Sequence, residues 1–485
     1  MSNGNSAGSP GDRERSDLPA PGTAETTEGR VVSVQGPIID VQFRKESDVP
    51  IVKAVIRTET IYGEKVTMEV AEHARGNIAR CVALNSTMNI QRNTPAYTEG
   101  MMIRVPIGDA LYSRIMNVQG EPIDGKGPIV TEETRPTREF RLSPLIRMDR
   151  KARRDFELLE TGVKMIDLLF PMVKGSKTGI LGGAGLGKTI IVLELIYQVI
   201  KKHSGTCVFT GVGERIREGN ELYYELSERG ILDRVAIVFG QMNEPPGCRF
   251  GAALTGATVA EAIQRKNIDV LLFVDNIFRY IQAGAEVSTL LGRVSSETGY
   301  QPTLISEASE FHERIRSTGD SAGSVTCVEA VYVPADDLTD PAVVAIFSFL
   351  DSTMVLSRER IQLGLYPAID PLLSSSANLD PDIVGKHHYA VSQDVIRVMQ
   401  RYNELKRIVL VIGIDELSPA DRILYERARK LQNFLTQPFF VAEAYTGKKG
   451  VYVTLAETLA GCARIMSGNL DHVPEEKFYM IGAIP

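Results

Sequence analysis

The chain of 485 residues has a mass of 53.3 kDa, about three times that of a typical domain, which predicts two or three domains. Hydrophobic residues make up 43% and charged residues 24% of it, a balance typical of globular proteins. The net charge of −7 argues against a strongly basic, nucleic-acid-binding surface. No run of about 18 apolar residues occurs, so no segment is expected to span a membrane.

Cysteine and histidine are sparse and scattered. No two cysteines form a CxxC pair, which argues against a disulfide scaffold or a zinc site and favours a reducing compartment. The cysteines are Cys81, Cys207, Cys248, Cys327 and Cys462.

Residues 1–28 differ in composition from the rest of the chain. They are rich in Gly, Pro and Ser, and their only large apolar residues are Met1 and Leu18, so they cannot bury enough surface to offset the entropy of ordering. Five acidic residues and the lack of an apolar stretch argue against a signal peptide or a transit peptide. We expect a disordered tail without a specific role.

Residues 29–105 predict a small all-β unit. Short β-rich runs at 31–34, 39–43 and 54–58 are separated by turn signals, the first of them Gly36-Pro37.

Residues 106–380 alternate apolar strands with helical patterns. Helices are expected near 190–202 and 253–265. Near-continuous apolar strands separated by helices indicate a parallel sheet covered on both faces. The expected strands are Thr178–Leu181, Cys207–Thr210, Val235–Phe239, Val270–Val274, Val328–Val333 and Met354–Leu356.

Residues 381–485 predict a helical domain, because apolar side chains recur there at helical spacing. The first series is Val391, Val395, Val398 and Tyr402, and the second is Leu424, Ala428, Leu431 and Leu435.

The strongest motif is a phosphate-binding loop of the form GxxxxGK[ST], placed between a predicted strand and a predicted helix. Its glycines allow backbone N–H groups to surround phosphate oxygens, and the helix N-terminus adds its dipole. Lys188 is expected to reach the β- and γ-phosphates and Thr189 to bind Mg²⁺. The loop comprises Gly182, Gly183, Ala184, Gly185, Leu186, Gly187, Lys188 and Thr189.

Two further segments supply acidic side chains. Asp275 ends the apolar run 270–274, at the strand edge where ligands gather in α/β sheets, although a helix cap is the alternative interpretation. The loop 211–220 carries Glu214, Arg215 and Glu218 and is a candidate for orienting and deprotonating water. In isolation that charge run would equally well be a solvated face.

Together these segments resemble the catalytic β subunit of F-type rotary ATP synthases, from about residue 29 to 485. The resemblance implies an N-terminal β-barrel, a central P-loop domain and a helical C-terminal domain. The motifs that carry it are GGAGLGKT (182–189), Gly211–Asn220, QMNEPPG (241–247), LLFVDNIFRY (271–280), GYQPTL (299–304), YVPADDLTDP (332–341) and LGLYPAIDPL (363–372).

The resemblance implies catalytic roles position by position. Glu214 matches the carboxylate that polarises the attacking water. Arg215 and Arg279 match arginines near the γ-phosphate, and Glu218 and Asp275 match the outer shell of Mg²⁺.

It also implies a binding pocket for the adenine base. Tyr366 matches the aromatic that stacks on adenine, Phe439 and Tyr445 match the residues that close the pocket, and Tyr332 matches a tyrosine near the phosphates. Without the resemblance, ordinary core packing would be the preferred interpretation of these aromatics.

The resemblance further implies an ATP synthase or ion-translocating ATPase that works on Mg²⁺-bound ATP and ADP. Expected partners are an α subunit alternating with this chain in a ring of six, a central γ shaft, further stalk subunits and, indirectly, a membrane rotor, with no nucleic acid. The expected location is peripheral, on the cytoplasmic face of a bacterial-type plasma membrane.

Some positions depart from the family pattern. The acidic DELSEED loop of the family here reads Asp415–Asp421 with Pro419 and Ala420 in place of two glutamates, and Tyr445 stands where Phe is commoner. These departures suggest a divergent, alternative-type member.

Two other classes of protein share parts of this pattern. A secretion-system ATPase or RNA translocase shares the core fold, but a translocase needs basic or aromatic pore loops, which the acidic balance disfavours. A non-catalytic nucleotide-binding ring subunit is disfavoured by Glu214.

Overall fold

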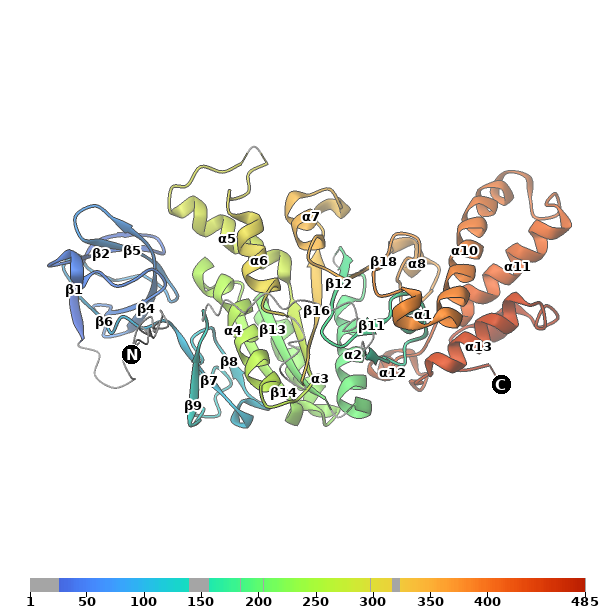
Figure 1. Cartoon of the computed structure of the whole chain (residues 1–485), viewed down its shortest axis with the longest axis horizontal. Coiled ribbons are helices and arrows are strands. Elements are labelled where there is room, and N and C mark those ends of the chain that lie inside the picture. Colours follow the sequence, from blue (N-terminus) through green and yellow to red (C-terminus); the bar gives the residue numbers. More distant parts are fainter. Residues whose placement is uncertain are drawn as a thin grey trace, which may run out of the picture.

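The computed structural model describes residues 26–138, 157–183, 185–203, 205–296, 298–315 and 323–484. A barrel, a central sheet with helices and a helical region follow one another along an elongated molecule (Figure 1). Most of the tail expected over 1–28 lies outside the described residues, as does Ala184 of the phosphate loop. Strand β1 begins at Thr27, inside the segment expected to be tail, because Thr27 and Glu28 pair with a neighbouring strand.

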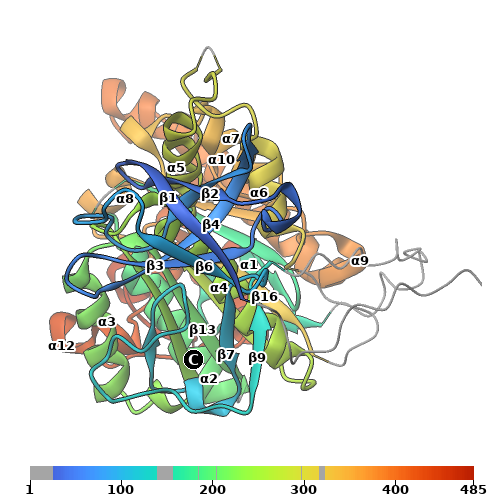
Figure 2. The same cartoon turned by 90° about the vertical axis from the view of Figure 1, so that its left-hand side faces the viewer.

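The N-terminal unit is a closed six-stranded barrel in the order β1-β2-β5-β4-β3-β6, and it faces the viewer in Figure 2. Neighbouring strands are antiparallel, and inward side chains such as Ile39, Val41 and Phe43 alternate with more exposed ones and fill the interior. The barrel implied by the resemblance is confirmed. Its strands are β1 (Thr27–Gln35), β2 (Ile38–Phe43), β3 (Val55–Glu59), β4 (Lys65–Ala74), β5 (Ile78–Ala83) and β6 (Pro95–Thr98).

The central sheet has the strand order β18-β17-β12-β16-β15-β13-β14-β8. Its pairs are parallel, as expected, except that the short edge strand β18 (Ser375–Ser376) runs antiparallel to β17. The other strands are β8 (Ile115–Met116), β12 (Lys177–Gly182), β13 (Thr206–Glu214), β14 (Val235–Gln241), β15 (Val270–Asp275), β16 (Val325–Tyr332) and β17 (Ser352–Val355).

Alternate side chains of these strands enter two separate hydrophobic cores. On β13, Cys207 and Phe209 face one core, whereas Val208 and Val212 face the other. Both faces of the sheet are therefore covered by helices, as the near-continuous apolar strands predicted. One face packs against α1 (Lys164–Leu169), α2 (Lys188–His203) and α3 (Ile216–Glu228), and the other against α4 (Pro246–Gln264), α5 (Ile277–Leu290), α6 (Leu304–His312) and α7 (Pro341–Phe347).

Helix α4 begins seven residues before the expected start at Ala253. Pro246 occupies its first turn, where the fixed φ of proline suits a helix and the missing N–H is not needed. The buried small residues that follow allow close packing on the sheet. Because they are buried on several sides, they show little amphipathic periodicity, and the sequence pattern did not indicate where the helix begins.

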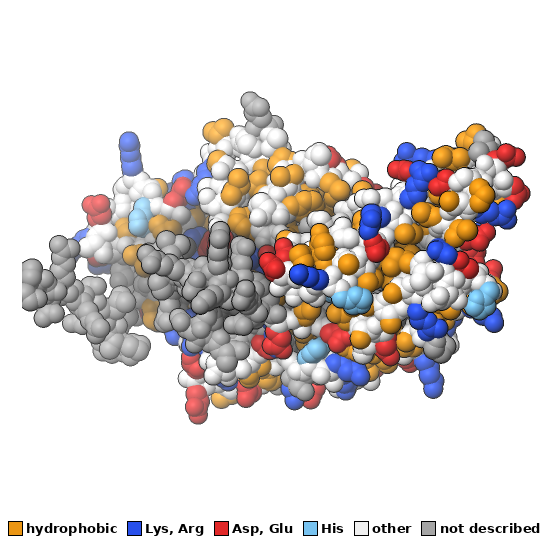
Figure 3. All heavy atoms as spheres, turned by 45° about the vertical axis from the view of Figure 1, so that its right-hand side comes forward, with side chains coloured by type: hydrophobic (Ala, Val, Ile, Leu, Met, Phe, Trp, Pro, Cys, Tyr) orange, Lys and Arg blue, Asp and Glu red, His pale blue; other side chains and the backbone are white. Residues whose placement is uncertain are grey.

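The C-terminal region is helical, as expected. Val391, Val395 and Met399 of the long helix α10 are buried, and Tyr402 packs on Tyr425 with ring centroids 4.9 Å apart. Charged side chains of both signs lie among hydrophobic ones on this end of the surface (Figure 3). The helices are α8 (Arg358–Gln362), α9 (Pro381–Val384), α10 (Lys386–Ile412), α11 (Pro419–Phe434), α12 (Glu443–Thr446) and α13 (Leu455–Met466).

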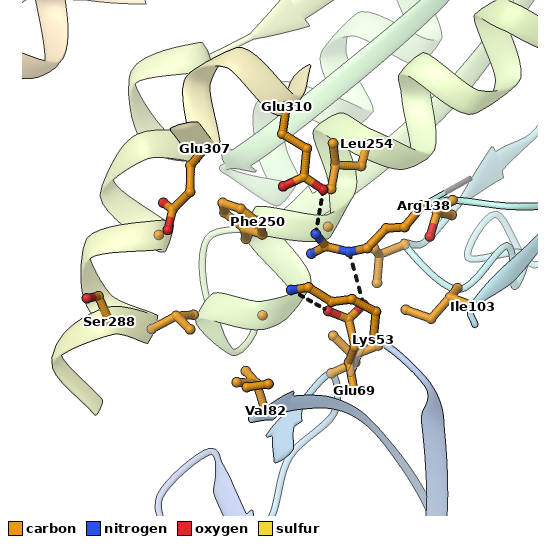
Figure 4. A pocket seen from close by; sticks show the side chains of 18 of the residues that line it. Lys53, Glu69, Val82, Ile103, Arg138, Phe250, Leu254, Ser288, Glu307 and Glu310 are labelled. Carbon is orange, nitrogen blue, oxygen red and sulfur yellow. Dashed lines mark hydrogen bonds and ion pairs between the residues drawn. The ribbon is translucent and has the colours of Figure 1, made fainter. Parts of the chain in front are cut away.

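An ion-pair network links the barrel to the central helices. Arg138 pairs with Glu69 of β4 at 3.2 Å and with Glu310 of α6 at 2.7 Å, and Lys53 also pairs with Glu69 (Figure 4). The network borders a cavity of about 110 Å³ whose other lining residues include Phe250 of α4. The strands β7 (Arg104–Ile107) and β9 (Glu133–Pro136) form a two-stranded antiparallel sheet, and β10 (Leu158–Leu159) and β11 (Met172–Val173) form another.

None of the helices that the structure describes is both long enough and apolar enough to cross a membrane.

Candidate functional site

Four strands of the parallel sheet end side by side and bring candidate residues together. Gly182 at the end of β12 pairs in register with Tyr332 at the end of β16, and Asp275 at the end of β15 pairs with Gly211 of β13. Glu214 ends β13 three residues later. The parallel register thus places the phosphate loop, two carboxylates and a tyrosine at the carboxyl edge of the sheet, where such folds bind ligands.

The phosphate loop turns from β12 into α2. Gly185 and Gly187 have φ values of 76° and 86°, in the left-handed region that glycine adopts without strain. Lys188, the first residue of α2, folds back so that its Nζ donates to the carbonyl oxygen of Gly182 at 2.6 Å. Leu186 is buried in the core, whereas Thr189 is exposed at the start of the helix. The loop is therefore anchored by Leu186 and leaves its helix N-terminus open.

Glu214 lies at the centre of a charged cluster. It is only 7% exposed, and its carboxylate is 3.3 Å from the guanidinium of Arg279 on α5. Arg279 also donates to the backbone carbonyl of Gly213, which fixes the arginine beside the end of β13. Gly213 has a φ of 63° at an irregularity in the β13–β14 pairing, and this local turn directs the chain at Glu214.

Burial and neighbouring charges perturb the ionisation of this cluster. Burial, the charge of Asp275 and a hydrogen bond with Glu218 raise the pKa of Glu214, and Arg279 opposes them only in part. Burial likewise raises the pKa of Asp275, against the charges of Lys188 and Arg279. Burial lowers the pKa of Lys188. Carboxylates crowded in a buried site carry an excess of negative charge that a cation would relieve.

The donor set fits Mg²⁺ held mainly through a nucleotide. Among the described residues, no group of three or more His, Cys, Asp or Glu side chains is placed to hold a metal ion. Mg²⁺ commonly keeps several waters and binds through one or two carboxylates together with substrate phosphates. Asp275, Glu218 and the Thr189 hydroxyl are oxygen donors of that kind on three elements around the loop.

Arg215 is the most exposed of the predicted catalytic residues and meets the cluster through Glu218. Its side chain is 63% exposed and lies 3.5 Å from Glu218 on the first turn of α3. It follows Glu214 directly in the chain, but Glu214 is buried at the strand end whereas Arg215 is solvent-exposed.

The aromatic side of the site is built differently. Tyr366 is 42% exposed on the loop after α8, and its carbonyl accepts a hydrogen bond from the backbone N–H of Gln437 at 3.0 Å. Phe439 is buried in the core, and the ring of the next residue, Phe440, stacks on Tyr197 of α2. Tyr445 is 79% exposed on α12. The segment that carries Phe439 thus rests on the helix that begins with Lys188.

Comparison with protein families covers most of the chain. Residues 31–100 match the ATP synthase alpha/beta family beta-barrel domain, and residues 162–376 match the ATP synthase alpha/beta family nucleotide-binding domain. The chain belongs to the ATP synthase alpha/beta family. Residues 377–476 match the C-terminal domain of V and A type ATP synthase. Membership implies an ATP-hydrolysing or ATP-forming rotary machine assembled as a ring with partner subunits.

The structure also places residues at the candidate site that the sequence did not indicate. A Cβ atom on Gly183 would come within 2.9 Å of Asp336 and of Arg358, so this charged pair lies against the phosphate loop. Asn276 is buried, and its side chain accepts from the backbone N–H groups of Phe278 and Tyr332, which ties β15 to β16. Asp336 and Asn276 stood inside recognised motifs, whereas no signal in the sequence distinguished Arg358.

Proposed function

We propose that this chain is the catalytic subunit of an F-type rotary ATP synthase. It interconverts ATP with ADP and phosphate, coupled through a central shaft to transmembrane ion flow. The observation that carries the proposal is Glu214, a buried carboxylate at a strand end beside Arg279 and the phosphate loop. A site that only binds nucleotide does not need a buried base there, whereas hydrolysis needs a group that orients and deprotonates water.

The other residues of the cluster suit the remaining tasks. The backbone of the loop from Gly182 to Thr189 binds the phosphates, and Lys188 exchanges its contact with the Gly182 carbonyl for the β- and γ-phosphates. Thr189, Glu218 and Asp275 would hold Mg²⁺, which supplies charge neutralisation at the phosphates when bound. Arg279 would stabilise charge on the transferring phosphoryl group.

Glu214 must be ionised to accept a proton from water. Burial and two neighbouring carboxylates favour its protonated form in the nucleotide-free site. Its pKa falls when Asp275 and Glu218 share their charge with a cation, so the basic form is favoured once the site is loaded.

The α10–α11 hairpin is proposed as the contact for a γ shaft. Leu410 and Val411 at its end are 78% and 83% exposed, next to Asp415 and Glu416. An exposed apolar group of this kind with adjacent charge is typical of a protein interface. The α subunits of the ring would flank the nucleotide site, where the exposed Arg215 and Arg358 remain available for contacts.

A subunit of a V or A type machine is the second candidate, favoured by the match over residues 377–476. The motifs of residues 182–372 support the F-type assignment. Reconstitution decides between them: a ring that turns over ATP with F-type α and γ subunits, and not with the V or A type counterparts, supports the F-type proposal.

Substitution of Glu214 tests the catalytic role. Glu214→Gln is nearly isosteric but cannot accept a proton, so kcat in a ring with the partner subunits should fall by about 10²–10⁴-fold. Binding of Mg·ATP should persist, because the phosphate loop is intact. The matched control is Glu221→Gln, which removes an exposed carboxylate from α3. Hydrolysis by Glu214→Gln within a few-fold of wild type would refute the assignment.

A further inference from the structure

Arg360 is a buried arginine outside the nucleotide site. It lies on the short helix α8 and is only 7% exposed. Its Nε is buried without a hydrogen-bond partner, and no hydrogen bond or ion pair joins its guanidinium to another residue that the structure describes. A buried N–H group without an acceptor is disfavoured, so an acceptor is expected to bind this guanidinium.

The guanidinium borders a cavity of about 90 Å³ between α8, the loop 363–372 and helices α10 and α11. A single water occupies roughly 30 Å³ of liquid, so the space is larger than one bridging water requires. Its lining supplies further hydrogen-bond donors in Tyr402, Asn403 and Gln432. Apolar walls are provided by Leu365, Leu372 and Met399.

The acidic residues at this cavity are already engaged elsewhere. Glu359 forms an ion pair with Lys406 of α10. Asp370 accepts the backbone N–H groups of Leu372 and Leu373 at 2.9 and 3.2 Å and so caps its own turn. Asp370 and Glu359 offset only part of the burial that lowers the pKa of Arg360. Neither carboxylate is within hydrogen-bond distance of the guanidinium.

We propose that this cavity is a binding site for a small oxyanion, a carboxylate or a phosphate, held by the guanidinium of Arg360 at the junction of α8 with the α10–α11 pair. The planar guanidinium presents parallel N–H donors that match the two oxygens of such an anion. The bound anion would join the loop 363–372, which also carries Tyr366, to the helical region. The site stands independently of the proposed catalytic function, because its lining includes no residue of the phosphate loop.

Thermal unfolding of the full chain at increasing anion concentration tests the proposal. Acetate and inorganic phosphate form separate arms, each balanced with chloride at constant ionic strength. All chains carry Lys188→Ala, so that the phosphate loop does not compete for phosphate. An anion that binds only the folded chain raises the unfolding midpoint in proportion to ln(1 + [L]/Kd).

We expect at least one anion to raise the midpoint of the chain with Arg360 and to have no such effect on Arg360→Met. Without anion, Arg360→Met should unfold at or above the midpoint of its parent. Methionine is an unbranched side chain that fills much of the same space, and the substitution removes a buried N–H group that has no acceptor. Arg397→Met is the matched control, since it removes an exposed arginine of α10, and it should keep the full anion response.

Comparison of the acetate and phosphate series identifies the chemical class of the anion. The preferred class is that of the anion that raises the unfolding midpoint at the lower concentration. If Arg360→Met does not fold, Arg360→Lys takes its place, with anion affinity expected to fall at least about tenfold because lysine lacks the planar fork. An equal response with and without Arg360 would overturn the proposal. So would the failure of both anions, or crystals soaked in them that show water alone on the guanidinium.

Discussion

The phosphate side and the aromatic side of the candidate site are held in place by different means. Glu214 and Asp275 end buried strands of one sheet, and their positions follow from its hydrogen-bond register. Tyr366 and Tyr445 lie on a loop and a four-residue helix and are 42% and 79% exposed. The phosphate side is therefore preorganised by the core of the domain, whereas the aromatic side depends on contacts that a ligand or a neighbouring subunit supplies.

This difference sets the size of the effects expected on substitution. A charged group fixed in a buried site interacts strongly, because little water screens it and little entropy is lost on binding. An exposed ring gains only its stacking area and must be ordered first. Substitutions on the phosphate side should therefore cost more affinity than those on the aromatic side.

Lys188→Ala should produce the largest loss of nucleotide affinity. Removing one partner of a buried charge pair typically costs about 2–5 kcal/mol, and both ATP binding and turnover should fall. Affinity measured by nucleotide titration of the full chain tests this. Lys201→Ala, an exposed lysine in the last turn of the same helix, is the control and should bind like wild type. A Lys188→Ala chain that binds ATP normally would mean that the loop backbone alone holds the phosphates.

Tyr366→Ala should have the next largest effect. Base stacking on an aromatic ring contributes about 1–3 kcal/mol, so the alanine variant should bind nucleotide more weakly by that amount. Tyr366→Phe preserves the ring face and should bind like wild type. Equal affinity of the alanine variant and wild type would place the adenine elsewhere on the molecule.

The sequence indicates where the phosphate loop and Asp275 lie in the fold, because short-range patterns determine both positions. A glycine-rich loop between an apolar strand and a helix has few other interpretations, and Asp275 follows directly from the end of its strand. The sequence could not show that Arg215 is exposed while Glu214 beside it is buried, because the turn at Gly213 depends on how β13 meets β14.

The aromatic side was predictable only through family resemblance. Phe439 is a core residue by every pattern in the sequence, and the structure does bury it. The segment that carries Phe439 is joined to Tyr366 by the hydrogen bond from the backbone N–H of Gln437 to the carbonyl oxygen of Tyr366. These two residues are 71 positions apart, so no local sequence pattern predicts their contact. Arg360 was missed for a related reason, since an arginine on a short polar helix is normally solvent-exposed.

A buried histidine beneath the phosphate side gives a smaller, pH-dependent effect. Nδ1 of His312 lies 2.6 Å from the carbonyl oxygen of Ala308, and Nε2 lies 3.0 Å from the carboxylate of Glu329 on β16. A carbonyl and a carboxylate both accept hydrogen bonds, so the two contacts favour the protonated ring. Burial and the charge of Lys177 lower the pKa of His312. The charge of Glu329 and the hydrogen bonds with Glu329 and Ala308 outweigh them, so the pKa of His312 is raised.

Because the pKa in the folded chain exceeds that of the unfolded chain, the stabilisation is complete below about pH 6.5 and is lost as the pH rises through the folded value. His312→Gln keeps only one of the two contacts and should lower the free energy of unfolding by about 1 kcal/mol at pH 6 and by less at pH 9. Thermal unfolding at both pH values, with the exposed His387→Gln as control, measures this difference. A loss that is the same at both pH values would show that His312 contributes packing alone.

Tyr445→Ala should have the smallest effect on nucleotide affinity. It also distinguishes the isolated chain from the chain assembled in a ring of subunits. The side chain is 79% exposed, and exposed substitutions usually change free energies by less than about 0.5 kcal/mol. In the isolated chain, nucleotide affinity should therefore be nearly unchanged, well below the loss for Tyr366→Ala. In a ring with partner subunits the effect should grow, because a neighbouring subunit that covers α12 would press Tyr445 toward the base. If Tyr445→Ala instead weakens binding in the isolated chain as much as Tyr366→Ala, the aromatic side is already closed without partners, and the contrast with the phosphate side fails.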